Sequence, residues 1–210
     1  MKSSYFHKLL TSLLFLFLIS LSFNLTLAAS NKASTTNANF VKKCCSSTTY
    51  TKLCYATLLG YAAQIQNNPK RLAAKSLEVT LKEAQYVARI TARLTNVRGL
   101  KRNERAALSD CTMAVDNSAA QLERSLGRMN RAVAWTPMEA SDVQTWTSTA
   151  MTYAATCMEG LNGSGMNGKV KNVVESKIVK LTHLTSNALA LIKRYYVAAA
   201  RNAHHHNNHP

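Results

Sequence analysis

The sequence predicts an all-α protein, an up-and-down four-helix bundle preceded by a short disulfide-closed helical hairpin. Three observations lead to this fold class. Apolar residues recur every three or four positions in four long stretches, the connections between these stretches are short, and no segment alternates as a strand does. Because short links place consecutive helices side by side, four such helices are expected to close around one core.

Residues 1–29 have the composition of a secretory signal peptide. Two lysines open the segment, a mostly apolar run spans residues 9–27, and small residues follow at Ala28 and Ala29. An uncleaved membrane anchor is the alternative, since the run approaches the ~20 residues that span a bilayer. We expect cleavage and secretion into the extracellular space, where cysteines oxidise, and no membrane contact of the mature chain.

The charge of the chain favours acidic partners. Lys and Arg number 26 against 10 Asp and Glu, a net charge of +16, which becomes +14 when Lys2 and Lys8 leave with the predicted leader. Such an excess attracts polyanions over long range. An extracellular location argues against nucleic acid and favours an acidic polysaccharide.

Residues 30–39 show no periodicity, and we predict a disordered start there. A helical hairpin is expected over about residues 40–66, because the hydroxyl side chains that follow Cys45 favour a turn. A Cys45–Cys54 bond would close this hairpin, although five cysteines leave one over. We take Cys44 as the odd one, either a free thiol or a bridge between two chains.

The bundle is predicted over about residues 68–200. Its first helix starts with Asn68 as N-cap and Pro69 at the first helical position, and it keeps helical phase until Gly99. The central helix, Arg105 to Met129, contains no proline. One apolar stripe runs along it: Leu108, Cys111, Val115, Ser118, Leu122 and Leu126.

The third helix has two possible starts, one turn apart. Thr136 and Ser141 each open a capping-box pattern. The helix then runs past Cys157 into a glycine-rich break, and if it packs beside the central helix, Cys111 and Cys157 can bond. The last helix is expected over about Lys169 to Ala200, followed by a mobile His-rich tail over residues 201–210.

No set of residues suited to catalysis stands out. Before the tail the mature chain has a single histidine, His183, and its carboxylates are scattered, so we expect no enzyme and no cofactor. The tail histidines could hold a metal weakly, but a polar tail is the preferred interpretation, and we predict no metal site. Asn162 opens an Asn-Gly-Ser sequon in a predicted loop, which makes it a candidate for glycosylation.

Four motifs occur in one order along the chain: Cys45–x8–Cys54, ALSDC at 107–111, TWTSTAMTYAATCMEGL at 145–161 and SNALALI at 186–192. Together they resemble the plant invertase and pectin methylesterase inhibitor family. The resemblance implies a hairpin plus a four-helix bundle, disulfides Cys45–Cys54 and Cys111–Cys157, and a cell-wall location. It also implies that the chain inhibits one of two target enzymes.

The resemblance favours pectin methylesterase as the target. The invertase-inhibiting branch carries a Pro-Lys-Phe tripeptide, which this sequence lacks. Invertase remains the alternative, as does a basic pectin-binding protein without inhibitory activity. Inhibitors of pectin methylesterase resemble one another in the central-helix pattern D-C-x-E-x-x-x-D-x-x-D.

In this chain that pattern keeps Asp110, but its three later acidic positions hold Met113, Asn117 and Ala120. With Arg124 one turn further on, these residues share one helix face. We expect this face to be exposed and to meet the esterase in a 1:1 complex that covers its substrate cleft.

Overall fold

The protein is represented by a computed structural model that describes residues 33–131 and 136–207. A first helical segment, residues 33–45, precedes the others. The remaining elements are, in order, α2 (Thr51–Leu58), η1 (Leu59–Tyr61), α3 (Ala62–Ile65), α4 (Pro69–Leu94), α5 (Arg102–Arg131), α6 (Pro137–Gly163) and α7 (Lys169–Asn207). The predicted fold class is confirmed, whereas the predicted leader, residues 1–29, lies outside the described residues.

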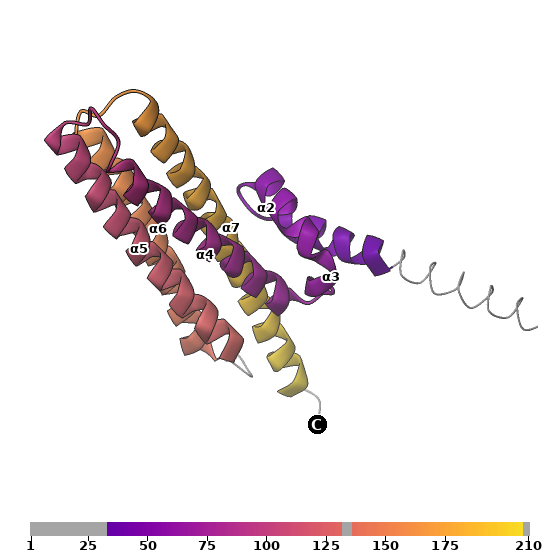
Figure 1. Cartoon of the computed structure of the whole chain (residues 1–210). Coiled ribbons are helices and arrows are strands. Elements are labelled where there is room, and N and C mark those ends of the chain that lie inside the picture. Colours follow the sequence, from indigo (N-terminus) through magenta and orange to yellow (C-terminus); the bar gives the residue numbers. More distant parts are fainter. Residues whose placement is uncertain (1–32, 132–135, 208–210) are drawn as a thin grey trace, which may run out of the picture.

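The four long helices pack in the order in which the chain makes them. Helix α5 packs against α4 and α6, and α7 packs against α6 and α4, so the helices form a closed ring of neighbours. Figure 1 shows them alongside one another, with the hairpin at one side. The apolar stripes meet in the centre, where the largest fully buried side chains include Leu77, Leu108, Leu122, Ile178, Leu181 and Ile192.

Two of the long helices begin where the sequence places their caps. The Asn68 side chain accepts a hydrogen bond from the Arg71 backbone N–H, with Pro69 at the first helical position. At α6 the Thr136 hydroxyl accepts from the Glu139 N–H, and the Glu139 carboxylate accepts from the Thr136 N–H. The Thr136 N–H and hydroxyl both donate to the Glu139 carboxylate, and these bonds hold the pKa of Glu139 below its usual range. Helix α6 therefore uses the earlier of its two possible starts.

The disordered start predicted for residues 30–39 is wrong where the structure describes it, because residues 33–39 are helical and continue into residues 40–45. No Gly or Pro interrupts this stretch. Val41 and Cys45 are completely buried, and Phe40 packs on the core. Burial of this last turn stabilises a helix whose preceding Ser, Thr and Asn residues disfavour one in isolation.

The boundary predicted at residue 201 is also wrong, since the backbone of α7 stays helical to Asn207. Residues 198–207 contain four alanines and no Gly or Pro, so nothing in the sequence stops the helix there.

The loop predicted around Asn162 is wrong as well. Asn162 lies in the last turn of α6, because the helix persists to Gly163. Its side chain is nevertheless exposed.

The turn of the hairpin is hydrogen-bonded to α7 of the bundle. The Tyr50 backbone N–H donates to Asn187 Oδ1 at 3.1 Å, and Asn187 Nδ2 donates back to the Tyr50 carbonyl at 3.0 Å. The Tyr50 ring stacks on His183, with ring centroids 3.6 Å apart. His183 therefore has a structural role. The Cys45–Cys54 disulfide closes the hairpin behind this contact.

Cys44 is a free cysteine with only 4% of its surface exposed. Burial raises the pKa of its thiol, and this effect outweighs the opposing charges of Arg194 and Lys43. We expect Cys44 to react slowly with iodoacetamide in the folded protein and rapidly after unfolding. Mass analysis of alkylated, non-reduced protein should show two disulfides and one thiol per chain. A covalent dimer through Cys44 would contradict this description.

Candidate functional site

The outer side of α5 carries a row of five exposed residues, which we call the α5 row: Asp110, Met113, Asn117, Ala120 and Arg124. The spacings of three and four residues keep the row on one side of the helix over about 21 Å. Met113 has 57% of its surface exposed, which is unusual for a long apolar side chain. The row is accordingly a surface on which apolar, amide and charged groups are all available for contact.

The side of α5 behind this row is held tightly against α6. Small residues allow the two helices to approach closely, and the Cα atoms of Cys111 and Cys157 lie 4.2 Å apart across their disulfide. The Ser118 hydroxyl donates to the Ala150 carbonyl at 2.9 Å. Further along, the Thr147 hydroxyl lies 3.2 Å from that of Ser125, and both are completely buried. A covalent bond and buried hydrogen bonds therefore make α5 and α6 a rigid support for the row.

A cluster of aromatic and cationic groups lies at the Arg124 end of the row. The Arg124 guanidinium lies 4.7 Å from the centroid of the Trp146 ring on α6, and Arg128 lies at 5.9 Å. Arg128 also approaches Asp142 at 3.5 Å. Helical periodicity places Trp146 on one stripe with Val143, Ala150 and Cys157, which are buried, but the structure leaves Trp146 only half-buried. Trp and Arg are the residue types that most often dominate binding energy at interfaces, a signal that periodicity alone does not give.

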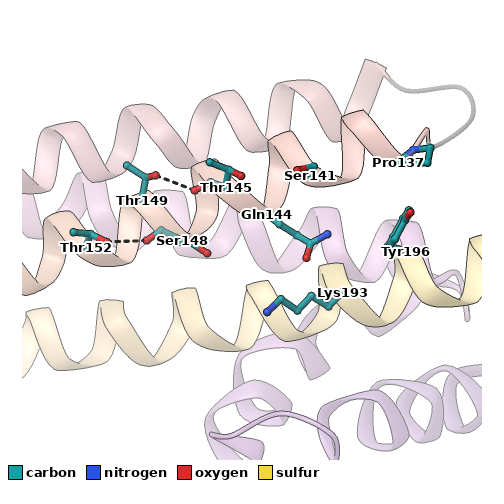
Figure 2. A pocket seen from close by; sticks show the side chains of 9 residues that line it. All are labelled: Pro137, Ser141, Gln144, Thr145, Ser148, Thr149, Thr152, Lys193 and Tyr196. Atoms are coloured by element: carbon teal, nitrogen blue, oxygen red, sulfur yellow. Dashed lines mark hydrogen bonds between the residues drawn. The ribbon is translucent and has the colours of Figure 1, made fainter.

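A groove of about 630 Å³ lies between α6 and α7 (Figure 2). Hydroxyl and amide side chains of α6 make up most of its wall: Ser141, Gln144, Thr145, Ser148, Thr149 and Thr152. Pro137 lies at one end, and α7 contributes Lys193 and Tyr196. The Thr149 hydroxyl donates to its own helix at the Thr145 carbonyl. The lining holds no carboxylate or histidine to pair with Lys193, so this groove offers surface for binding and no acid–base pair.

Metal and membrane features are absent from the part of the chain that the structure describes. No group of three or more His, Cys, Asp or Glu side chains there lies close enough to hold a metal ion. Among these residues no helix combines the length and apolar character needed to cross a bilayer. The side chains of the histidine-rich tail and the apolar leader lie outside the described parts.

These observations define a disulfide-bonded helical protein that presents a row of exposed side chains on a rigid pair of helices. The comparison with known families agrees with this class. The chain belongs to the plant invertase/pectin methylesterase inhibitor family, whose model matches residues 39–191. The family is one of enzyme inhibitors and not of catalysts.

Individual relatives extend over most of the chain. A "21 kDa protein" of Daucus carota is 38% identical over 191 residues, which cover 88% of this chain and 97% of the relative. "Pectinesterase inhibitor 11" of Arabidopsis thaliana is 38% identical over 192 residues, covering 87% and 94%. A crystal structure of a mutant form of a pectin methylesterase inhibitor from Arabidopsis superposes with a TM-score of 0.57. That superposition covers 71% of this chain and 92% of the other at 16% identity, and it supports the fold alone.

Proposed function

We propose that this protein is a secreted inhibitor of pectin methylesterase. It binds the enzyme in a 1:1 complex through the α5 row and covers the substrate cleft, which limits de-esterification of pectin in the plant cell wall. Family membership and relatives named pectinesterase inhibitors support this choice of target. One observation supports this choice of docking face: Met113, Asn117 and Ala120 are exposed, and they occupy the positions of the family's acidic pattern.

The chemistry of the row suits a protein partner more than a small substrate. It extends about 21 Å along α5, and its backbone is held by the Cys111–Cys157 bond. A surface that is already rigid loses little conformational entropy when it binds. Arg124 and Trp146 supply the two side-chain types most able to anchor such an interface.

A panel of enzymes tests the proposal and its alternative together. Purified protein should be assayed against several plant pectin methylesterases at acidic and neutral pH, and against cell-wall and vacuolar invertases. We expect inhibition of at least one esterase and of no invertase. Inhibition of invertase alone would reverse the assignment, and inhibition of neither enzyme would leave the family fold without the proposed activity.

Restoring the family's acids tests the docking face itself. The triple variant Met113→Glu/Asn117→Asp/Ala120→Asp should fold normally, because all three positions are exposed and surface substitutions typically change stability by about ±0.5 kcal/mol. We expect tighter binding to pectin methylesterase, measured by calorimetry, because acids at these positions belong to the family pattern. Unchanged affinity for every esterase in the panel would remove this face from recognition.

A further inference from the structure

The hairpin covers only part of the surface formed by α4 and α7. Helix α2 packs on both helices, and its seam with them is lined by Ser76 and Thr80 of α4 and by Leu184 and Asn187 of α7. Figure 1 shows the hairpin beside one portion of this helix pair and the remainder uncovered. Since neighbouring helices of the bundle run antiparallel, the later turns of α4 and the early turns of α7 share the uncovered part.

An exposed aromatic ring and three cationic side chains lie on this uncovered part. Tyr86 of α4 has 42% of its surface exposed, and the Lys177 ammonium of α7 lies 5.4 Å from the centroid of its ring. Arg89 and Arg93 follow three and seven residues after Tyr86, so they lie on the same side of α4, and both are exposed. We call Tyr86, Arg89, Arg93 and Lys177 the α4–α7 basic face.

The cations of this face are not neutralised by the protein. Nearby carboxylates are already engaged elsewhere, since Glu83 pairs with Lys180 at 2.8 Å and Glu175 with Lys171 at 3.5 Å. Within the described residues, neither Arg89 nor Arg93 nor Lys177 takes part in an ion pair with a carboxylate.

Positive charge continues beyond α4, where Arg98, Lys101 and Arg102 are exposed in the connection to α5 and at its first residue. These exposed cations add to the positive charge of α4, which attracts an anion over long range.

The combination of a ring and flanking cations fits an acidic sugar. The apolar C–H face of a pyranose can stack on the exposed side of the Tyr86 ring, while guanidinium and ammonium groups bind the carboxylate of a uronic acid. From Tyr86 to Arg93 the helix advances about 10 Å, which suits consecutive units of a polymer better than a single sugar.

We propose that the α4–α7 basic face binds a polyuronate, namely de-esterified pectin. The choice of this polymer rests on the proposed function, because a pectin methylesterase leaves carboxylates on its substrate. Helices α4 and α7 form the edge of the bundle opposite α5 and α6, so a bound polymer leaves the α5 row free for the enzyme. The protein would thereby be retained at the regions of the wall where the esterase has already acted.

Calorimetric titration with fully de-esterified polygalacturonate oligomers tests the site. Arg89→Gln/Arg93→Gln should weaken binding about tenfold, as expected for the loss of two exposed charged contacts. The matched control Lys42→Gln/Lys52→Gln removes the same charge from exposed positions on the hairpin side and should change affinity less than twofold. Equal losses in the two variants would mean diffuse attraction to net charge and would overturn the site.

The aromatic contact is tested without a change in charge. Tyr86→Ala should weaken oligomer binding by about threefold or more, and Tyr86→Phe should retain it, because stacking needs the ring and not its hydroxyl. Fully methyl-esterified oligomers should not bind, and 1 M NaCl, which shortens screening to about 3 Å, should abolish binding. Unchanged oligomer affinity in Tyr86→Ala would contradict a sugar-binding site. So would an equal loss of affinity in Tyr86→Ala for RNA or for anionic vesicles.

The same variants separate this inference from the proposed inhibition. Binding of purified esterase, measured without any polymer present, should be unchanged in Tyr86→Ala and in Arg89→Gln/Arg93→Gln. A protein that binds the oligomers as expected but no esterase would contradict the inhibitor function alone. Loss of esterase binding in these variants would show that this face belongs to the enzyme interface and would overturn its assignment to the polymer.

Discussion

Removing the Cys111–Cys157 disulfide is expected to lower the free energy of unfolding by about 4 kcal/mol. The bond joins residues 46 positions apart, and a cross-link restricts the unfolded chain more as the loop it closes becomes longer. Because folded domains are stable by only about 5–15 kcal/mol, the double variant Cys111→Ala/Cys157→Ala should melt about 10 °C lower or fail to fold at 37 °C. The measurement is denaturant unfolding followed by circular dichroism, with Cys44→Ala as background to prevent disulfide exchange.

The hairpin disulfide provides the matched control. Cys45 and Cys54 are only nine positions apart, so Cys45→Ala/Cys54→Ala should cost about 2.5–3 kcal/mol by the same estimate. The α5–α6 bond also lies directly behind the α5 row, whereas the hairpin bond does not. An equal or smaller loss in Cys111→Ala/Cys157→Ala than in the control would contradict its role as the main cross-link of the bundle.

Placing a bulky side chain in the middle of the α5 row is expected to abolish inhibition. Ala120 is exposed, and Trp at this position would hold a partner away from both Asn117 and Arg124. We expect Ala120→Trp to weaken binding to pectin methylesterase at least a hundredfold, about 2.7 kcal/mol, since central positions dominate interface energies. Affinity is measured by titration calorimetry, and a thermal melt verifies that the variant folds.

Ala56→Trp is the control for this experiment. Ala56 lies on α2 of the hairpin, is also exposed and is remote from the α5 row in sequence and in helix packing. Its substitution should leave the affinity for the esterase unchanged. If both variants bind the enzyme normally, the docking face lies elsewhere on the bundle, and the groove between α6 and α7 becomes the next surface to test.

Most of the fold could be predicted from the sequence, because apolar residues recur at helical intervals. Five of the six stripe residues of the central helix are buried and the sixth, Leu126, is partly buried. The caps at Asn68 and Thr136 are present. Such features are local, since the helical period and the capping side chains depend only on residues close together in the sequence. Both disulfides join the cysteines expected to pair.

Features that depend on contacts between residues far apart in the sequence were harder to predict. Residues 33–39 are helical because the turn that follows them buries Val41, which their own polar composition does not reveal. Similarly, the exposure of Trp146 beside Arg124 depends on how α6 is rotated against α5. The α4–α7 basic face combines α4 with a lysine of α7, and the sequence separates Tyr86 from Lys177 by almost half the chain.

The most direct test of the central claim is a kinetic titration of one inhibited pectin methylesterase with the purified protein. Methanol release should fall linearly and end at one inhibitor per enzyme. The apparent inhibition constant should rise with pectin concentration, because an inhibitor that covers the cleft would compete with the substrate. Inhibition that is independent of pectin concentration, or a titration that shows no endpoint near equimolar protein, would contradict a 1:1 complex that covers the active site.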